Sequence, residues 1–146
     1  MKTPLWRCPK CGHRFASKNL WHSCGRFRLA DHFAGRDPAV RSLWDQFVAL
    51  LRRNGPVTVY AQKTRIVCMV RVRFAGAQVR SRWLDAGLWL KRRASHPALR
   101  RVDFLPPHDY LHYFRLRSGA DLDAAFAALT REAYAIGTQA HRRSAR

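Results

Sequence analysis

The sequence predicts an α+β domain in which an antiparallel sheet of three to five strands is flanked by an N-terminal and a C-terminal helix. Helical apolar spacing over residues 38–53 and again before residue 137 predicts the helices. Several short runs of alternating apolar residues between positions 57 and 117 predict the strands. These strands follow one another too closely to leave room for the crossover helices of a parallel sheet.

The two helices have recognisable starts and stops. Asp37 and Pro38 pair an N-cap residue with a proline at the first helical position, and Gly55 and Pro56 end the helix over 38–53. Its apolar stripe is Val40, Leu43, Trp44, Phe47, Leu50 and Leu51. Ser118 is expected to cap the last helix, with Asp121 as the capping-box carboxylate and Gly137 at its end. Its stripe is Leu122, Phe126, Leu129, Ala133 and Ile136.

The strand runs cover residues 57–62, 64–77, 81–92 and 109–117, and the stretch 94–108 is predicted as a loop with room for a short strand around Val102 to Leu105. The run 64–77 is interpreted as one long strand. One of its faces carries Ile66, Cys68, Val70, Val72 and Phe74. The other carries Arg65, Val67, Met69, Arg71 and Arg73.

The charge balance restricts the function classes. The chain has 146 residues with 28 Lys and Arg against nine Asp and Glu, a formal net charge of +19. Such a surface attracts polyanions, of which nucleic acid is the most common in a cell, although a solvated basic surface is the simpler alternative. The sequence has no apolar run of about 20 residues and no apolar core of a signal peptide near its start, so a cytoplasmic protein is expected.

Three cysteines and two histidines lie in the segment from Leu5 to Phe27, which is too short to fold on a hydrophobic core alone. The spacing predicts a structural Zn²⁺ site in a small N-terminal zinc-knuckle module, with the ligands Cys8, Cys11, His22 and Cys24. The run CPKCG lets two thiolates reach one ion, and the run HSC places an imidazole and a thiolate on one side of the chain. The alternatives are His13 in place of His22, and iron–sulfur ligation.

The runs WRCPKCGHRFASKNLWHSCG, GPVTVYAQKTRIVCMVRVRFAGA and RWLDAGLWLKRR together resemble the bacterial domain-of-unknown-function 5655 (DUF5655) family, from about Trp6 to Gly137. Cys8, Cys11, His22 and Cys24 occupy that family's N-terminal CPxCG…HxC pattern. The resemblance implies the architecture and an auxiliary nucleic-acid role, but no activity. The expected organisation is a zinc-binding module over 1–27, a linker with a short helical turn over 28–37, the α+β domain over 38–137 and a basic tail over 138–146.

The predicted strands collect basic and aromatic side chains on one sheet face. Aromatic rings on a sheet can stack bases, and guanidinium groups can hold phosphates, so this face is the predicted nucleic-acid-binding surface. Its residues are Lys63, Arg65, Arg71, Arg73, Trp83, Trp89, Tyr113, Arg115 and Arg117. The interpretation requires that no helix covers this face. In the alternative, the rings pack beneath arginine stems or a helix.

An enzyme is less consistent with the sequence. A metal-dependent nuclease needs clustered carboxylates, but Glu132 is the only glutamate and the aspartates are dispersed. A hydrolase would require Asp85, His112 and Lys63 to converge in one pocket. Cys68 and His112 lie at alternating positions with apolar residues of their strands, so both are predicted to be core residues. The hypotheses are therefore a nucleic-acid-binding accessory protein, a protein-interaction module that docks an acidic partner, and an unrecognised hydrolase.

Overall fold

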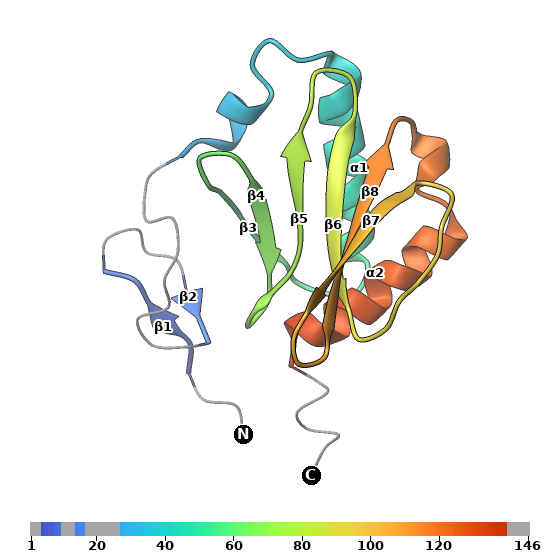
Figure 1. The fold of residues 1–146 in the computed structure, drawn as a ribbon. Coiled ribbons are helices and arrows are strands. Elements are labelled where there is room, and N and C mark those ends of the chain that lie inside the picture. The colour runs from blue at the N-terminus through green and yellow to red at the C-terminus, as the bar shows by residue number, and fades with distance from the viewer. Residues whose placement is uncertain (1–3, 10–13, 17–26, 140–146) are drawn as a thin grey trace.

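The computed structural model describes residues 4–9, 14–16 and 27–139, and its fold is an α+β domain beside a short N-terminal ribbon (Figure 1). The ribbon pairs β1 (Trp6–Arg7) with β2 (Arg14–Phe15). The domain has the elements η1 (Leu29–His32), α1 (Pro38–Arg52), β3 (Thr58–Ala61), β4 (Ile66–Met69), β5 (Arg73–Val79), β6 (Leu84–Leu90), β7 (Leu99–Leu105), β8 (Asp109–Leu116), η2 (Gly119–Asp121) and α2 (Ala124–Gly137).

The main sheet has six strands in the order β3-β4-β5-β6-β8-β7, and every neighbouring pair is antiparallel. The predicted α+β class and antiparallel sheet are confirmed, but the predicted count of three to five strands is too low. The sixth strand arises because the run 64–77, predicted as one strand, folds as a hairpin of β4 and β5. The short strand allowed for around Val102 to Leu105 lies within β7, which begins earlier, at Leu99. Within the described ranges, no helix has the length and apolar character needed to cross a membrane.

Both helices pack on the same face of the sheet (Figure 1). Most residues of the predicted apolar stripes are buried there, including Val40 and Phe47 of α1 and Phe126 of α2, whereas Leu122 precedes α2 and is only partly buried. Phe126 lies edge-on to Phe114 of β8, with 5.0 Å between ring centroids, and Phe47 lies 6.1 Å from Phe126. The helix-facing side of the sheet is therefore the apolar side that alternation predicted.

A β-bulge in the β4–β5 hairpin fixes which side chains face the helices. Cys68 pairs with Ala75 and Met69 pairs with Arg73, so Phe74 is an extra residue on β5. Phe74 and Ala75 are both buried in the helix-facing core. The bulge therefore directs Phe74 toward the helices, while Arg73 lines the opposite face of the sheet.

The end of α2 anchors the same hairpin. The backbone N–H groups of Arg71 and Val72 donate to the carbonyl oxygen of Gly137, with N···O distances of 2.9 and 3.2 Å. Gly137 also lies against the ring of Phe74, which packs edge-on to Tyr134 of α2. The expected Ser118–Asp121 capping belongs to η2, because α2 itself begins three residues later, where the Asp123 carboxylate accepts from the Phe126 N–H at 2.8 Å.

The N-terminal ribbon packs against the face of the sheet that the helices leave open. Cys8 is buried with Tyr60 of β3 and with Val67 and Met69 of β4, and Trp6 packs against this cluster. This small second core covers only the β3–β4 side of the open face. The portion formed by β5, β6, β8 and β7 is not covered by either described α-helix.

Replacing Gly137 with alanine should destabilise the domain by about 1–3 kcal/mol, since an added Cβ overpacks a filled core. That Cβ would lie 2.4 Å from Cδ1 and 3.2 Å from Cβ of Phe74, and the ring is fully buried. Chemical denaturation measures the change. The matched control is Gly119→Ala, because the nearest atoms to its Cβ would belong to the flexible end of the Gln46 side chain. Equal stability of Gly137→Ala and the wild type would contradict this account of the helix–hairpin contact.

Stability should also fall as pH drops below the ordinary pKa of histidine, because of His112. Burial lowers the pKa of His112, and the nearby Arg92 and Arg93 lower it further, against the hydrogen bond to Tyr110. Its Nε2 accepts from the Ala94 N–H at 2.9 Å and its Nδ1 donates to the Tyr110 carbonyl at 3.0 Å, which fixes the neutral ring. The unfolded chain then binds a proton that the folded chain resists, so the stabilisation is present above the unfolded-state pKa and lost below it.

Urea unfolding at a series of pH values between 5 and 8 measures this dependence. His112→Gln should be less stable at neutral pH and should lose less stability on acidification than the wild type. The control His108→Gln changes an exposed histidine of the β7–β8 turn and should keep the wild-type profile. An unchanged acid profile in His112→Gln would assign the pH dependence to other groups.

Candidate nucleic-acid interface

The open face of the sheet contains a hollow of about 350 Å³, here called the sheet hollow. Strand pairing builds it, since Val67, Gly76, Gly87 and Tyr113 lie side by side across β4, β5, β6 and β8. Trp89 and Asp85 flank Gly87 on the same face of β6, because side chains two residues apart share a face. The arginines that line the sheet hollow are Arg65, Arg73, Arg80, Arg100, Arg101 and Arg115.

The lining of the sheet hollow is strongly cationic. Asp85 is the one acidic residue among the described residues that line it. Its carboxylate is already occupied, with Arg80 Nε at 2.7 Å from Oδ2 and Trp83 Nε1 donating to Oδ1 at 3.0 Å. Arg80 is paired with Asp85 and Arg101 with Asp103, whereas no ion pair is found among the described residues for the other four arginines of the lining. The hollow therefore favours an anionic ligand.

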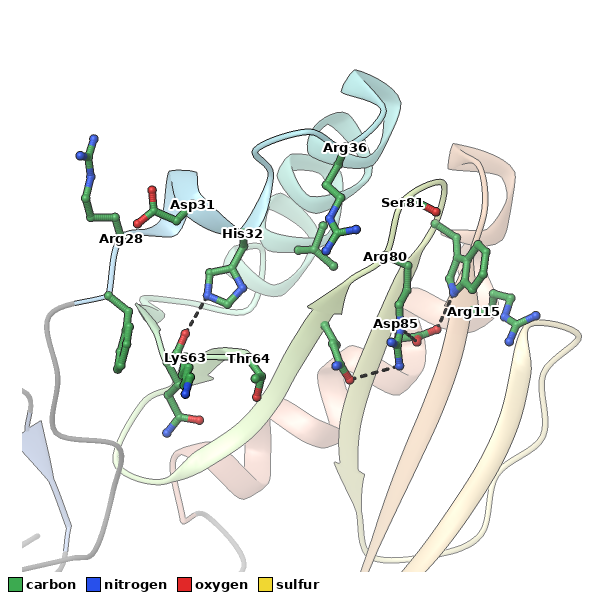
Figure 2. A pocket seen from close by; sticks show the side chains of 15 residues that line it. Arg28, Asp31, His32, Arg36, Lys63, Thr64, Arg80, Ser81, Asp85 and Arg115 are labelled. Atoms are coloured by element: carbon green, nitrogen blue, oxygen red, sulfur yellow. Dashed lines mark hydrogen bonds and ion pairs between the residues drawn. The ribbon is translucent and has the colours of Figure 1, made fainter.

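A second hollow of about 560 Å³, the edge hollow, continues from the first at the end of the sheet where η1 lies. Figure 2 shows Lys63 from the β3–β4 turn, His32 from η1, and Arg80, Asp85 and Arg115 around it. His32 Nε2 lies 2.7 Å from the Gln62 carbonyl oxygen, which ties η1 to the β3–β4 turn. Gln62, Gln78, Arg80, Asp85 and Arg115 line both hollows, so the two form one trough.

Aromatic rings and guanidinium groups are stacked along this trough. Arg115 lies over the ring of Trp83, with its Cζ 4.7 Å from the ring centroid, and Arg117 lies 5.8 Å from the same ring. Arg101 lies 4.2 Å from the Tyr113 ring centroid. A hydrogen bond to Tyr113 raises the pKa of Arg101, so this guanidinium stays charged. Such stacks present flat cationic surfaces of the kind that bind bases and phosphates.

Most of the predicted surface residues come together. Arg65, Arg73, Trp89, Tyr113 and Arg115 line the sheet hollow, and Lys63, Trp83 and Arg115 line the edge hollow. Arg117 lines neither, but it lies beside Trp83.

Arg71 departs from the prediction. It lies in the hairpin turn between β4 and β5, and its Nε donates to Gln139 Oε1 at 2.9 Å. Met69 pairs with Arg73, so the chain reverses direction at Arg71, and the strand alternation that placed Arg71 on the binding face does not extend to it.

Sequence reasoning missed the arginines of β7. Arg100 and Arg101 line the sheet hollow, but the strand allowed for in their stretch began only around Val102, whereas β7 begins at Leu99. Gly76 and Gly87 were also missed as site residues. The parity of β6 did place Gly87 on the same face as Trp89, so a signal for Gly87 was present in the sequence.

The acidic residues of the chain, all within the described ranges, are mostly engaged in local structure. Asp37 and Asp123 cap the helices, and Asp121 accepts from the N–H groups of Arg117 and Ser118. Five further carboxylates form ion pairs, namely Asp45 with Arg41, Asp85 with Arg80, Asp103 with Arg101, Asp109 with Lys91, and Glu132 with Arg92. Most of the carboxylates therefore already have a partner within the protein, and the large excess of basic side chains has no acidic counterpart.

The predicted metal site lies mostly outside the described residues. Cys8 is described and buried, whereas Cys11, His22, Cys24 and the alternative ligand His13 are not described. Over residues 4–9, 14–16 and 27–139, no group of three or more His, Cys, Asp or Glu side chains could hold a metal ion. The fourth cysteine, Cys68, is fully buried, and burial raises the pKa of its thiol to about 12. Cys68 is therefore a core residue and not a nucleophile.

The three residues that would define a hydrolase do not converge. Lys63 and Asp85 line the edge hollow, while His112 is fully buried and its ring packs parallel to Phe114 of the core. Its two ring nitrogens are engaged with backbone groups.

Comparison with known proteins identifies a family without assigning an activity. The family model described as Domain of unknown function (DUF5655) matches residues 29–137, which are the described domain without the N-terminal ribbon. No curated protein and no solved structure matches the chain. The matched segment includes every strand of the six-stranded sheet, both α-helices and all residues that line the trough except Phe27 and Arg28, and it covers well over half of the sequence. The chain therefore belongs to the DUF5655 family.

Proposed function

We propose that this protein binds nucleic acid through the trough on the open face of its sheet, as an accessory protein without catalysis of its own. The observation that carries the proposal is the sheet hollow, in which six arginines surround Trp89 and Tyr113 on a face that neither α-helix covers. Phosphates satisfy arginines, and bases stack on exposed rings, so one strand can engage both kinds of side chain at once.

The distribution of charge favours a polyanion over a small acidic ligand. The trough extends over both hollows, and Lys63, Arg65, Arg100 and Arg115 are placed along it. A row of cations longer than one phosphate group matches a repeating backbone charge. Binding of this kind releases condensed counterions, so the affinity should fall steeply as salt is added.

The second candidate function is a protein-interaction module whose basic face docks an acidic protein. The same arginines support it, but stacked rings and a hollow between strands are features that planar bases use better than carboxylate side chains do. Affinity purification with and without nuclease treatment separates the two functions. Partners that disappear after nuclease treatment support nucleic-acid binding, and a protein partner that survives it supports docking.

We also propose a structural Zn²⁺ held by Cys8, Cys11, His22 and Cys24. Three thiolates and one imidazole suit zinc and leave no position for a substrate, so the ion would only fold the N-terminal segment. The burial of Cys8 against Tyr60 and Met69 supports a structural role for this segment, because it places the first proposed ligand at the surface of the sheet.

Removal of two trough arginines should weaken binding, while removal of two arginines elsewhere should not. Arg65→Ala/Arg100→Ala deletes two exposed residues that line the sheet hollow. We expect an affinity loss of about tenfold or more, roughly 1.4 kcal/mol, and a shallower dependence on salt. Fluorescence anisotropy with a labelled oligonucleotide, titrated at several salt concentrations, measures both.

The matched control is Arg53→Ala/Arg131→Ala, which removes the same charge from exposed positions near the end of α1 and on α2. It should keep wild-type affinity within about twofold. An equal loss of affinity in both double variants would show that binding depends on the overall charge of the protein and not on the trough. No measurable binding by the wild type at low salt would refute the proposed function.

Metal analysis of the purified chain should give one zinc per molecule, and Cys8→Ser should lose it. Cys68→Ala is the control, because Cys68 lies in the helix-facing core, and it should retain the zinc. Chelation should release the N-terminal segment while far-ultraviolet circular dichroism of the sheet domain persists, since the main core contains no residue before position 29. Retention of full zinc content by Cys8→Ser would show that the ligand set is wrong.

A further inference from the structure

The floor of the sheet hollow is formed by two paired glycines. Gly76 of β5 and Gly87 of β6 are directly opposite one another in the register, between Val67 of β4 and Tyr113 of β8. Side chains normally fill such a row across the middle of a sheet face. Here two neighbouring positions carry none, and the volume of about 350 Å³ lies above bare backbone. It falls in the range of about 300–1,000 Å³ typical of pockets for small ligands.

The packing of the sheet requires glycine at position 76 but does not require it at position 87. A Cβ on Gly76 would lie 2.7 Å from the carbonyl oxygen of Ile66, so only glycine fits there. A Cβ on Gly87 would meet Leu111 Cδ1 at 3.5 Å, which is ordinary contact, and Gly87 does not have a positive φ angle. Glycine inside a strand is less favourable for stability than alanine, because glycine loses more conformational entropy on folding. Gly87 therefore keeps space open at a cost to stability.

A cationic group with unused hydrogen-bond donors lines the same hollow. Nε and Nη2 of Arg73 are buried, and no described residue accepts a hydrogen bond from either nitrogen. Nε of Arg115 is in the same condition. A buried donor left without an acceptor destabilises a protein. Both nitrogens have less than 1 Å² of accessible area, so a ligand oxygen reaches them only when the Arg73 guanidinium turns toward the hollow. A phosphate carries enough oxygens to accept from both nitrogens in that orientation.

We propose that the sheet hollow is a pocket for a single nucleotide unit of a single strand. The base lies flat over Gly76 and Gly87, beside Trp89 and Tyr113, and the phosphate is bound by Arg73. The amides of Gln62 and Gln78, which line the hollow, can hydrogen-bond to the edge of the base. A base within a duplex is paired and stacked, so only an unstacked base can reach this floor. This inference rests on the proposed function and narrows it to single strands.

The decisive variant is Gly87→Val, which fills the pocket without changing charge. Anisotropy of the full chain with a labelled single-stranded 15-mer, and with its duplex, measures the effect. We expect the wild type to prefer the single strand, and Gly87→Val to weaken single-strand binding about tenfold or more while duplex binding changes less than twofold. Gly87→Ala should have a smaller effect in the same direction. Thermal melting should show that Gly87→Ala is at least as stable as the wild type and that Gly87→Val is folded.

Free nucleoside monophosphates provide the second arm, observed by chemical-shift changes of the Trp89 indole. AMP, GMP, CMP and UMP should each bind weakly at this site, and Gly87→Val should abolish the shifts. A free monophosphate that binds more tightly than the oligonucleotide would overturn the assignment to a strand and identify a free nucleotide as the ligand.

The two proposals fail in different ways. Wild-type single-strand affinity in Gly87→Val and Gly87→Ala would overturn the pocket, yet the trough would stand if Arg65→Ala/Arg100→Ala still weakened binding. Equal affinity of the wild type for single strand and duplex would also overturn the pocket alone. Absence of all oligonucleotide binding would overturn both.

Discussion

The packing of both helices on one face of the sheet is the constraint on which the rest of the structure depends. Phe114 of β8 and Phe126 of α2 meet edge-on at 5.0 Å, and Phe47 of α1 completes this contact, so the apolar side of every central strand is committed to the helices. The backbone of the strands is satisfied by its neighbours in the sheet, and the opposite face needs no apolar cover to be stable. That face can therefore carry arginine, tryptophan and glycine without loss of the core.

The β-bulge at Phe74 connects this core to the proposed binding surface. An extra residue on β5 turns Phe74 toward α2, where Gly137 leaves room for its ring and the Gly137 carbonyl accepts from the hairpin turn. The same bulge leaves Arg73 on the open face, where its guanidinium lines the sheet hollow. Bulges are common beside functional sites because they redirect one side chain without breaking the sheet. Here the helix–hairpin contact also fixes the direction of an arginine.

Local patterns in the sequence predicted the α+β class, both α-helices and runs that include five of the six strands, with part of β7 as an optional short strand. The reversal between β4 and β5, the full extent of β7 and the sheet hollow were not predicted, and each has a physical reason. Apolar alternation continues through Val70 and Val72, so the reversal between β4 and β5 resembles unbroken strand. β7 is an edge strand with half-exposed and exposed residues, and it lacks the alternation that a buried face imposes. The hollow depends on Gly76 meeting Gly87 across two strands. That register is set by the whole sheet, so no local pattern contains it.

The open face is itself divided in two, and the division follows the strand sequences. On the β3–β4 side its residues are Tyr60, Val67 and Met69, which are apolar and are covered by Cys8 and Trp6 of the N-terminal segment. On the β5–β8 side they are glycines, arginines and aromatic rings around the sheet hollow. An exposed apolar patch next to a cationic trough would favour aggregation over specific binding. A small N-terminal segment beside the trough therefore has a physical role without any chemistry of its own, because it covers the apolar half of a face whose other half remains open to a ligand.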